Sequence, residues 1–161
     1  MINLIQGDLF TVKSGILVHG CNCVGAFGAG VALIVRNIYP HVHEEYVALC
    51  KQVDSPQDLL GRVQYVNVPT ADGTFLIANA FTQLEPGTDY RRVDYEAVAM
   101  CFEDINDVLS NHHIAAGISD LTVSFPKIGA GLAGGSWDVI EKIIDVSVSD
   151  EFRKVLYVPG G

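Results

Sequence analysis

Two glycine-rich loops are the segments of this chain best suited to bind a ligand. Residues 25–30 read GAFGAG and residues 129–135 read GAGLAGG, and each loop lies between a strand-like and a helix-like segment. Glycine lets the backbone approach a ligand closely, and a helix N-terminus offers free N–H groups and a favourable dipole to an anion. One such loop is more typical of a tight turn. Two of them in a small acidic chain favour a site for two linked phosphates.

The second loop also fits the dinucleotide-binding fingerprint G-x-G-x-x-G through Gly129, Gly131 and Gly134. That fingerprint normally opens the first βαβ unit and needs an acidic residue about 20 positions later, followed by more strands. Only one helix and one strand have room after Gly134, which excludes this interpretation. A Walker A loop is excluded as well, because the chain has no Gly-Lys-Ser/Thr triplet.

His19 ends an apolar segment directly before the first loop, where a ligand would lie. It is therefore either a core histidine with satisfied hydrogen bonds or a group that exchanges protons with a substrate. His19, Cys21 and Cys23 alternate along the chain and suggest a metal site, but zinc needs further ligands. No pattern singles out the other histidines as ligands, which are His41, His43, His112 and His113. Buried, reduced cysteines are the better interpretation of this cysteine pair.

Composition limits the class of protein. The chain has 161 residues, which predicts a single domain over residues 1–161. Hydrophobic residues make up 49% and charged residues 18%, which is typical of a compact globular fold. The net charge of −9 argues against direct nucleic-acid binding, because a polyanion would be repelled. Any anionic ligand must therefore be held by local donors such as backbone N–H groups.

The start of the chain and its cysteines indicate a cellular compartment. No charged segment followed by an apolar stretch opens the sequence, and no apolar run approaches the roughly 20 residues of a membrane span. The four cysteines are then expected to be free thiols in a reducing environment. These features predict a cytoplasmic protein that binds no membrane.

Strand-like and helix-like segments alternate along the chain. Short runs rich in β-branched residues predict strands, and apolar residues at i+3/i+4 spacing predict helices. The predicted strands are residues 3–5, 15–19, 62–68, 74–80, 121–125 and 154–158, and the predicted helices are 31–39, 41–52, 93–109 and 136–146. This order predicts an α/β fold with a mixed sheet flanked by helices and ligand sites outside the strand ends.

Taken together, these pieces resemble the macro domain family of ADP-ribose-binding modules. The resemblance rests on three segments: Gly7-Asp8 after the first strand, residues 17–22 (LVHGCN) before the first loop, and residues 126–132 (PKIGAGL) in the second. It covers nearly the whole chain and is strongest to the branch of the yeast ADP-ribose 1″-phosphate phosphatase and related ADP-ribosyl hydrolases. It implies a three-layer α/β/α sandwich that binds ADP-ribose at the strand ends, without a cofactor or a metal.

The resemblance also implies roles for individual residues. Asp8, which by itself is either a turn former or an acceptor for a base's amino group, would hold adenine. Tyr157 would line the adenine or the proximal ribose, and Asn22 would face the distal ribose beside His19. The residues that would surround the diphosphate and the distal ribose are Gly25, Gly28, Ala29, Gly30, Val31, Gly129, Ala130, Gly131 and Leu132.

Three functions follow from this resemblance. The first is a phosphatase that removes the 1″-phosphate of ADP-ribose 1″-phosphate, with His19 and Asn22 as its catalytic residues. The second is a module that binds ADP-ribose or an ADP-ribosylated partner without turnover. The third, an ADP-ribosyl hydrolase, is disfavoured because those enzymes resemble one another in an aspartate after the Gly-x-Gly-Leu of the second loop, where this chain has Ala133.

Overall fold

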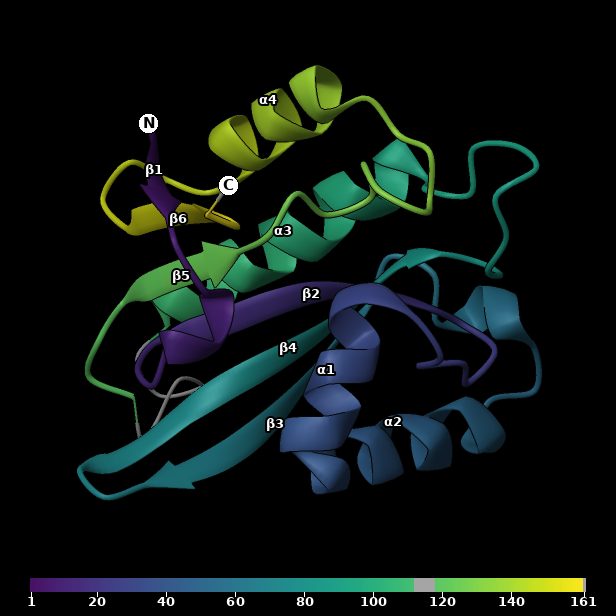
Figure 1. Ribbon diagram of the computed structural model, residues 1–161, viewed down its shortest axis with the longest axis horizontal. Helices are drawn as coiled ribbons and strands as arrows, with labels where there is room; N and C mark the ends of the chain where they lie inside the picture. The colour runs from purple at the N-terminus through teal and green to yellow at the C-terminus, as the bar shows by residue number, and fades with distance from the viewer. Residues whose placement is uncertain (112–117, 161) are drawn as a thin grey trace.

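The computed structural model, which describes residues 1–111 and 118–160, has a twisted central sheet between two pairs of helices (Figure 1). The strands are β1 (Ile2–Gln6), β2 (Ile16–Asn22), β3 (Val63–Thr70), β4 (Gly73–Gln83), β5 (Thr122–Phe125) and β6 (Arg153–Val158). They form one six-stranded sheet in the order β1-β6-β5-β2-β4-β3. Only the β3–β4 hairpin is antiparallel, so the sheet is mixed, as predicted.

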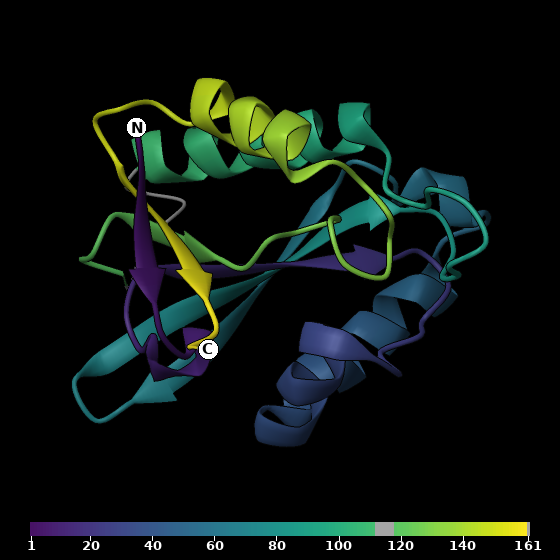
Figure 2. The same cartoon turned by 45° about the horizontal axis from the view of Figure 1, so that its top comes forward.

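The helices cover both faces of the sheet. They are α1 (Gly30–Ile38), α2 (Pro40–Gln52), α3 (Tyr95–Ser110) and α4 (Trp137–Ser147). Figures 1 and 2 show α1 and α2 on one face and α3 and α4 on the other. The predicted three-layer α/β/α sandwich is therefore confirmed. Among the described residues, no helix is both long and apolar enough to cross a lipid bilayer.

Alternation along β2 divides the hydrophobic core into two layers. Ile16 and Val18 pack in the layer with α3 and α4, whereas Leu17 and Cys21 pack in the layer with α1 and α2. Successive side chains of a strand point to opposite faces, so a strand buried on both faces needs an almost continuous apolar run. The sequence of β2 has this run, which explains why it lies in the middle of the sheet.

Two strands that end at the edge expected to bind a ligand continue about three residues further than the sequence predicted. β2 extends past His19 to Asn22, and β4 extends past Ala80 to Gln83. Pro40 begins α2, because proline is tolerated in the first helical turn, where its missing N–H has no partner to lose. Short 3₁₀ helices at Leu9–Thr11 and Pro56–Asp58 were not predicted. His112 and His113 lie outside the described residues.

The sheet topology brings the two glycine loops together. Each loop follows a strand at its carboxyl end, the first after β2 and the second after β5, and these strands are parallel neighbours. Parallel neighbours end at the same edge of the sheet, so both loops lie at that edge. Each loop then leads into a helix, α1 after the first and α4 after the second, on opposite faces of the sheet.

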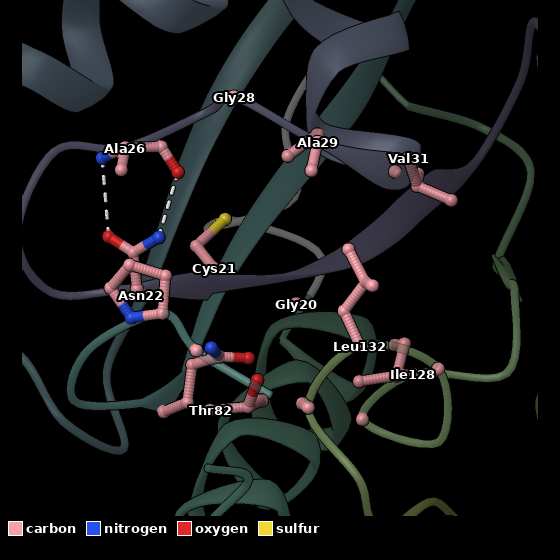
Figure 3. Close-up of a pocket in the computed structure, with 18 of the residues that line it drawn as sticks. Gly20, Cys21, Asn22, Ala26, Gly28, Ala29, Val31, Thr82, Ile128 and Leu132 are labelled. Carbon is pink, nitrogen blue, oxygen red and sulfur yellow. Dashed lines mark hydrogen bonds between the residues drawn. The ribbon is translucent and has the colours of Figure 1, made fainter. Parts of the chain in front are cut away.

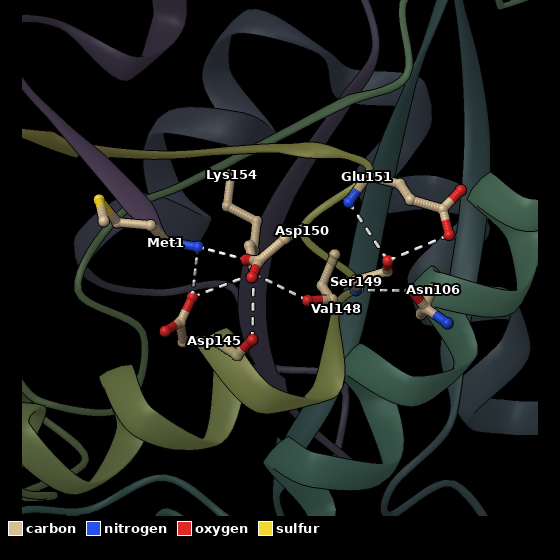
Figure 4. Close-up of polar contacts among 8 residues, drawn as sticks. All are labelled: Met1, Asn106, Asp145, Val148, Ser149, Asp150, Glu151 and Lys154. Atoms are coloured by element: carbon tan, nitrogen blue, oxygen red, sulfur yellow. Dashed lines mark hydrogen bonds and ion pairs between the residues drawn. The ribbon is translucent and has the colours of Figure 1, made fainter.

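At the far side of the molecule, a fully buried lysine holds the last helix to the last strand (Figure 4). The Nζ atom of Lys154 donates to the carbonyl of Val148 at 2.8 Å and to the carbonyl of Asp145 at 3.0 Å. It also lies 3.0 Å from a carboxylate oxygen of Asp145 and of Asp150. The N-terminal ammonium group and Lys154 lower the pKa of Asp150 from 3.8 to about 2.

Replacing Lys154 with Met tests this cluster. The substitution leaves two carbonyls without their donor and is expected to cost about 2–3 kcal/mol of unfolding free energy at pH 7, measured by chemical denaturation. Because the pKa of Asp150 is lowered in the folded state to about 2, the wild type should lose stability as the pH falls from about 4 to 2, and Lys154→Met should show less of this loss. The matched control is Lys142→Met on an exposed position of α4. A Lys154→Met protein as stable as the control would contradict the role of the cluster.

Candidate functional site

A cavity of about 580 Å³ opens between the two glycine loops at the carboxyl edge of the sheet. Its floor comes from the ends of β2 and β4, and its sides come from the loops after β2, β4 and β5. The residues that line it are 20–22, Ala26, 28–32, 82–83, 86–88, 126–129 and 131–133. Figure 3 shows side chains from all of these strand ends converging on one space.

The side chain of Asn22 fixes the first loop (Figure 3). Its Nδ2 atom donates to the carbonyl of Ala26 at 2.7 Å, and its Oδ1 atom accepts the N–H groups of Val24 at 3.1 Å and Ala26 at 3.2 Å. The hydroxyl of Tyr46, which is fully buried, lies 2.8 Å from the same Oδ1 atom and accepts the N–H of Gly25 at 3.1 Å. The loop conformation is thus set by an amide and a phenol below it.

An aromatic anchor in the first loop adds to these hydrogen bonds. Phe27 is 1% exposed and stacks on the ring of Tyr46, with 4.0 Å between ring centroids. It also contacts two histidine rings, that of His19 edge-on at 5.2 Å and that of His43 at 5.5 Å. Aromatic pairs in these arrangements add to the free energy gained by burial. The middle of a loop that reaches into the cavity is therefore tied to the core.

His19 lies below the loop and not among the residues that line the cavity. Its side chain is fully buried, and its Nε2 atom is 2.6 Å from Oδ1 of Asn79. Burial lowers the pKa of His19 to about 4, against a smaller opposing effect of the hydrogen bond to Asn79. At neutral pH the ring is uncharged and supports Phe27 from below, which argues against direct proton exchange with a ligand.

The start of α1 supplies hydrogen-bond donors to the cavity. Residues 29–32 line it, and Ala29, at the N-cap, makes no side-chain cap. The first-turn N–H groups of a helix have no carbonyl of their own helix to bind, and they carry the positive end of the dipole. Gly30 has φ = +60°, a left-handed conformation that glycine adopts without strain. These N–H groups can bind an anion.

The second loop folds on itself to form the opposite wall. The N–H of Gly135 donates to the carbonyl of Gly129 at 2.7 Å, and that of Gly134 to the carbonyl of Gly131 at 3.1 Å. Gly129 has φ = +74°, and a Cβ atom built on it would lie 2.6 Å from a side-chain atom of Val93. A side chain at Gly129 is therefore excluded by both conformation and space.

A third wall comes from the segment after β4, which Arg92 organises. Its guanidinium group contacts the carboxylates of Glu85 at 2.5 Å and Asp89 at 2.6 Å and lies 3.8 Å from the ring centroid of Tyr90. The backbone N–H of Arg92 donates to the carbonyl of Ala133 at 2.8 Å, which ties this segment to the second loop. Residues 86–88 of the segment line the cavity.

The cavity has an electrostatic character opposite to that of the whole chain. Lys127, which is exposed at the rim, is the one charged residue among those that line it, all of which the structure describes. The lining contains no carboxylate, although the chain carries a net charge of −9. Burial raises the pKa of the Cys21 thiol, so this group stays neutral. Free N–H groups and one lysine therefore suit a negatively charged ligand.

The cavity brings together eight of the residues that the sequence singled out, which are Asn22, Gly28, Ala29, Gly30, Val31, Gly129, Gly131 and Leu132. His19, Gly25 and Ala130 belong to the adjoining structure but are not part of the lining. Asp8 and Tyr157 lie further along the same edge, because β1 and β6 pair in parallel there. Asp8 is exposed and accepts the N–H of Phe10 at 2.9 Å, and Tyr157 is half-buried.

Sequence reasoning assigned no role to several lining residues, above all Gly20, Thr82, Gln83, residues 86–88 and Lys127. Thr82 and Gln83 were missed because the predicted strand stopped at Ala80. The run Phe81-Thr82 has strand-forming residue types and would have extended that strand. Residues 86–88 reach the cavity through contacts of Arg92, which local patterns do not reveal.

Comparison with known proteins agrees with this geometry. The Macro domain model matches residues 18–144. The ADP-ribose 1″-phosphate phosphatase of Meyerozyma guilliermondii is 28% identical over 89% of this chain and 91% of its own, and that of Saccharomyces cerevisiae is 26% identical over 89% and 91%.

A solved structure also has this fold over its whole length. The macrodomain protein of Streptomyces coelicolor is 26% identical, covers 99% of this chain and 100% of its own, and superimposes with a TM-score of 0.76. The family model spans both glycine loops, most of β2 and all of β5. Together, the sequence match and the fold show that the chain belongs to the macro domain family.

Proposed function

We propose that this protein binds ADP-ribose derivatives in the cavity between its glycine loops and hydrolyses ADP-ribose 1″-phosphate to ADP-ribose and phosphate. The observation that carries this proposal is a cavity of about 580 Å³ without a carboxylate in its described lining, at the N-terminus of α1. Relatives named ADP-ribose 1″-phosphate phosphatase match this chain over most of their own length, which supports the proposal.

The diphosphate would lie against the first turn of α1 and the backbone of the second loop. Residues 28–31, Gly129, Gly131 and Leu132 would donate N–H groups to it, and Lys127 would add a positive charge at the rim. The N–H of Ala130 already donates to the carbonyl of Lys127 at 3.3 Å, so Ala130 would contribute indirectly. Gly25 contributes indirectly, because its N–H already donates to Tyr46. Asp8 and Tyr157 would hold the adenosine end, which their position on the same edge of the sheet supports.

Asn22 acts in this proposal mainly by ordering the loop that receives the phosphates. Three hydrogen bonds join its side chain to Val24 and Ala26 of that loop, and a fourth joins it to Tyr46. Its place in the lining would also bring it near the distal ribose. His19 would support the same loop through Phe27. Its buried, neutral ring favours this positioning role over the acid–base role that the resemblance implied.

A second candidate function is binding without turnover. It is favoured by the absence of Asp, Glu and His from the cavity lining, all of whose residues are described. Such a cavity binds an anion but offers no side chain that takes a proton from an attacking water at neutral pH. A reader of ADP-ribose or of ADP-ribosylated partners would need no more than this.

A cytoplasmic location is part of the proposal. All four cysteines are free thiols, three of them buried, and a small protein of an oxidising compartment normally pairs its cysteines.

Phosphorus NMR of ADP-ribose 1″-phosphate with the protein, at neutral pH and with chelator present, separates the two functions. A phosphatase releases inorganic phosphate, which is the result we expect. Shifted or broadened diphosphate signals without free phosphate would instead identify a binding module. An unchanged spectrum would contradict both.

A pair of variants at Ala29 tests whether the N-terminus of α1 binds the phosphates of ADP-ribose in the same NMR experiment. Ala29→Asp places a carboxylate at the N-cap, which suits a helix but repels a phosphate, and should weaken binding about 10-fold or more. Ala29→Ser adds a neutral cap and should weaken binding less.

Replacing Tyr46 with Phe removes one hydroxyl below the first loop and leaves the cavity lining intact. We expect a stability loss of about 1–2 kcal/mol, faster hydrogen exchange of the Gly25 amide, and about 5-fold weaker binding of ADP-ribose. Calorimetry and NMR measure these effects. Tyr65→Phe is the matched control, because the hydroxyl of Tyr65 donates to Asp104 on α3 at 2.7 Å, away from the loop. Equal affinities of the two variants would show that the loop does not depend on Tyr46.

The buried state of His19 predicts a pH dependence of stability. Its pKa is lowered from 6.5 to about 4 in the folded state, so the unfolded chain binds the extra proton first. The stabilising contribution is complete above pH 6.5 and is lost as the pH falls to about 4, by at most about 3 kcal/mol.

Denaturation of wild type, His19→Gln and the exposed control His41→Gln at pH 7 and pH 4.5 checks this. The difference in unfolding free energy between pH 7 and pH 4.5 should be smaller than in wild type only for His19→Gln. A turnover profile with an inflection between pH 6 and 7 that disappears in His19→Gln would instead support the acid–base role.

A further inference from the structure

One polar group at the floor of the cavity lacks a partner. The side chain of Thr82 is fully buried, and its Oγ1 atom makes no hydrogen bond within the described structure. A buried hydroxyl without a partner costs about 1–3 kcal/mol. Thr82 also lines the cavity, and Figure 3 shows its side chain beside Ile128 and Gly20. The hydroxyl is therefore an unused hydrogen-bonding group in a residue that lines the cavity.

An irregularity of the sheet places Thr82 there. Cys21 on β2 pairs with Phe81 on β4, but the next residue, Asn22, pairs with Gln83. Thr82 is therefore the extra residue of a β-bulge at the carboxyl end of β4. Bulges occur often beside functional sites, where they redirect a side chain. The carbonyl of Thr82 is bound by the N–H of Asp94 at 2.8 Å, which holds the bulge in place.

Gly20 packs closely against this hydroxyl. A Cβ atom built on Gly20 would lie 2.8 Å from Oγ1 of Thr82 and 3.1 Å from Cγ2 of Ile128. Its φ angle is negative, so its conformation does not demand glycine. A side chain at this position would clash with Oγ1 of Thr82, so only glycine leaves the buried hydroxyl without a covering side chain.

The floor suits a sugar better than a phosphate. Gly20, Cys21, Thr82 and Ile128 are uncharged there, and the one lysine of the lining is exposed at the rim. A doubly charged phosphate on this floor would lose its hydration without gaining a cation. A ribose hydroxyl is neutral and, like the threonine hydroxyl, both donates and accepts a hydrogen bond. The N–H groups of the glycine loops remain for the phosphates.

We propose that Thr82, a buried residue at the bulge of β4 that Gly20 leaves without a covering side chain, is a specificity-determining residue that binds a hydroxyl of the ligand's terminal ribose. Through it the site distinguishes ADP-ribose from ADP, which has the same diphosphate but no terminal sugar. This inference rests on the proposed binding of ADP-ribose. It assigns a task to a residue for which the pattern of the sequence indicated none.

Calorimetric titration of ADP-ribose and ADP into wild type, Thr82→Val and Thr82→Ser tests the proposal. Valine has the shape of threonine without its hydroxyl, so Thr82→Val should bind ADP-ribose about 10-fold more weakly and ADP with less than about 2-fold change. Thr82→Ser keeps the hydroxyl and should stay close to wild type. Without ligand, Thr82→Val should melt at the same or a higher temperature than wild type, because it removes an unpaired polar group.

Thr74→Val is the matched control. Thr74 lies on the same strand, but its hydroxyl donates to the carbonyl of Val68 at 3.0 Å. This variant should lose thermal stability and keep its affinity for ADP-ribose, which is the opposite pattern to Thr82→Val.

The possible outcomes separate the two levels of the proposal. If wild type and Thr82→Val bind ADP-ribose equally, the role of Thr82 is wrong while the proposed function stands. An equal loss for ADP and ADP-ribose would also overturn it, because the hydroxyl would then serve the diphosphate or the fold. If wild type binds no ADP-ribose, both the proposed function and this inference fail.

Discussion

The candidate site depends on the hydrogen bonds between one buried phenol, one amide and the loop that follows β2. The side chain of Asn22 binds the N–H of Val24 and the carbonyl of Ala26, and the hydroxyl of Tyr46 binds the N–H of Gly25 and the side chain of Asn22. Without these two side chains, those backbone groups of the loop would lack these partners. Their effect is to aim the rest of the loop and the start of α1 at the cavity. A chain with a net charge of −9 has few cations to spare for a phosphate, so oriented N–H groups must take their place. Such groups bind an anion only while the backbone that carries them is held rigid.

Two buried ionisable groups stabilise opposite sides of the fold, and each does so in the charge state that its surroundings permit. His19 has amide and aromatic neighbours. The amide nitrogen of Asn79 donates to Gln64 at 3.0 Å, so the oxygen of Asn79 faces His19 and accepts a hydrogen bond from its Nε2 atom. Burial keeps the ring neutral, against the smaller opposing effect of that hydrogen bond on its pKa. Lys154 has carboxylates and carbonyls as neighbours and stays charged. Acid would act first on His19, below pH 6.5, and on the carboxylate of Asp150 only below about pH 4.

The order of strands and helices could be predicted from the sequence, because each element carries its own apolar pattern and the glycines mark where it ends. The glycine loops were recognised for the same reason. The register between β2 and β4 could not be predicted, since the bulge at Thr82 depends on how two segments about 60 residues apart align. The position of His19 was ambiguous because its neighbours on the strand do not reveal which face it occupies. In the structure the side chain lies on the face with Phe27 and not in the cavity.

The lack of a base in the cavity lining does not by itself decide between turnover and binding. Transfer of a phosphoryl group passes through a loose transition state, so positioning and neutralisation of charge do most of the catalytic work. In the proposed mode of binding, the N–H groups at α1 and in the second loop, with Lys127, would provide both. The same groups would also hold the diphosphate, which is common to substrate and product and so contributes binding without acceleration. What distinguishes the two functions is the terminal ribose. If it rests on the neutral floor at Thr82, its phosphate must point toward the loops and the rim, where both donors and water are available for hydrolysis.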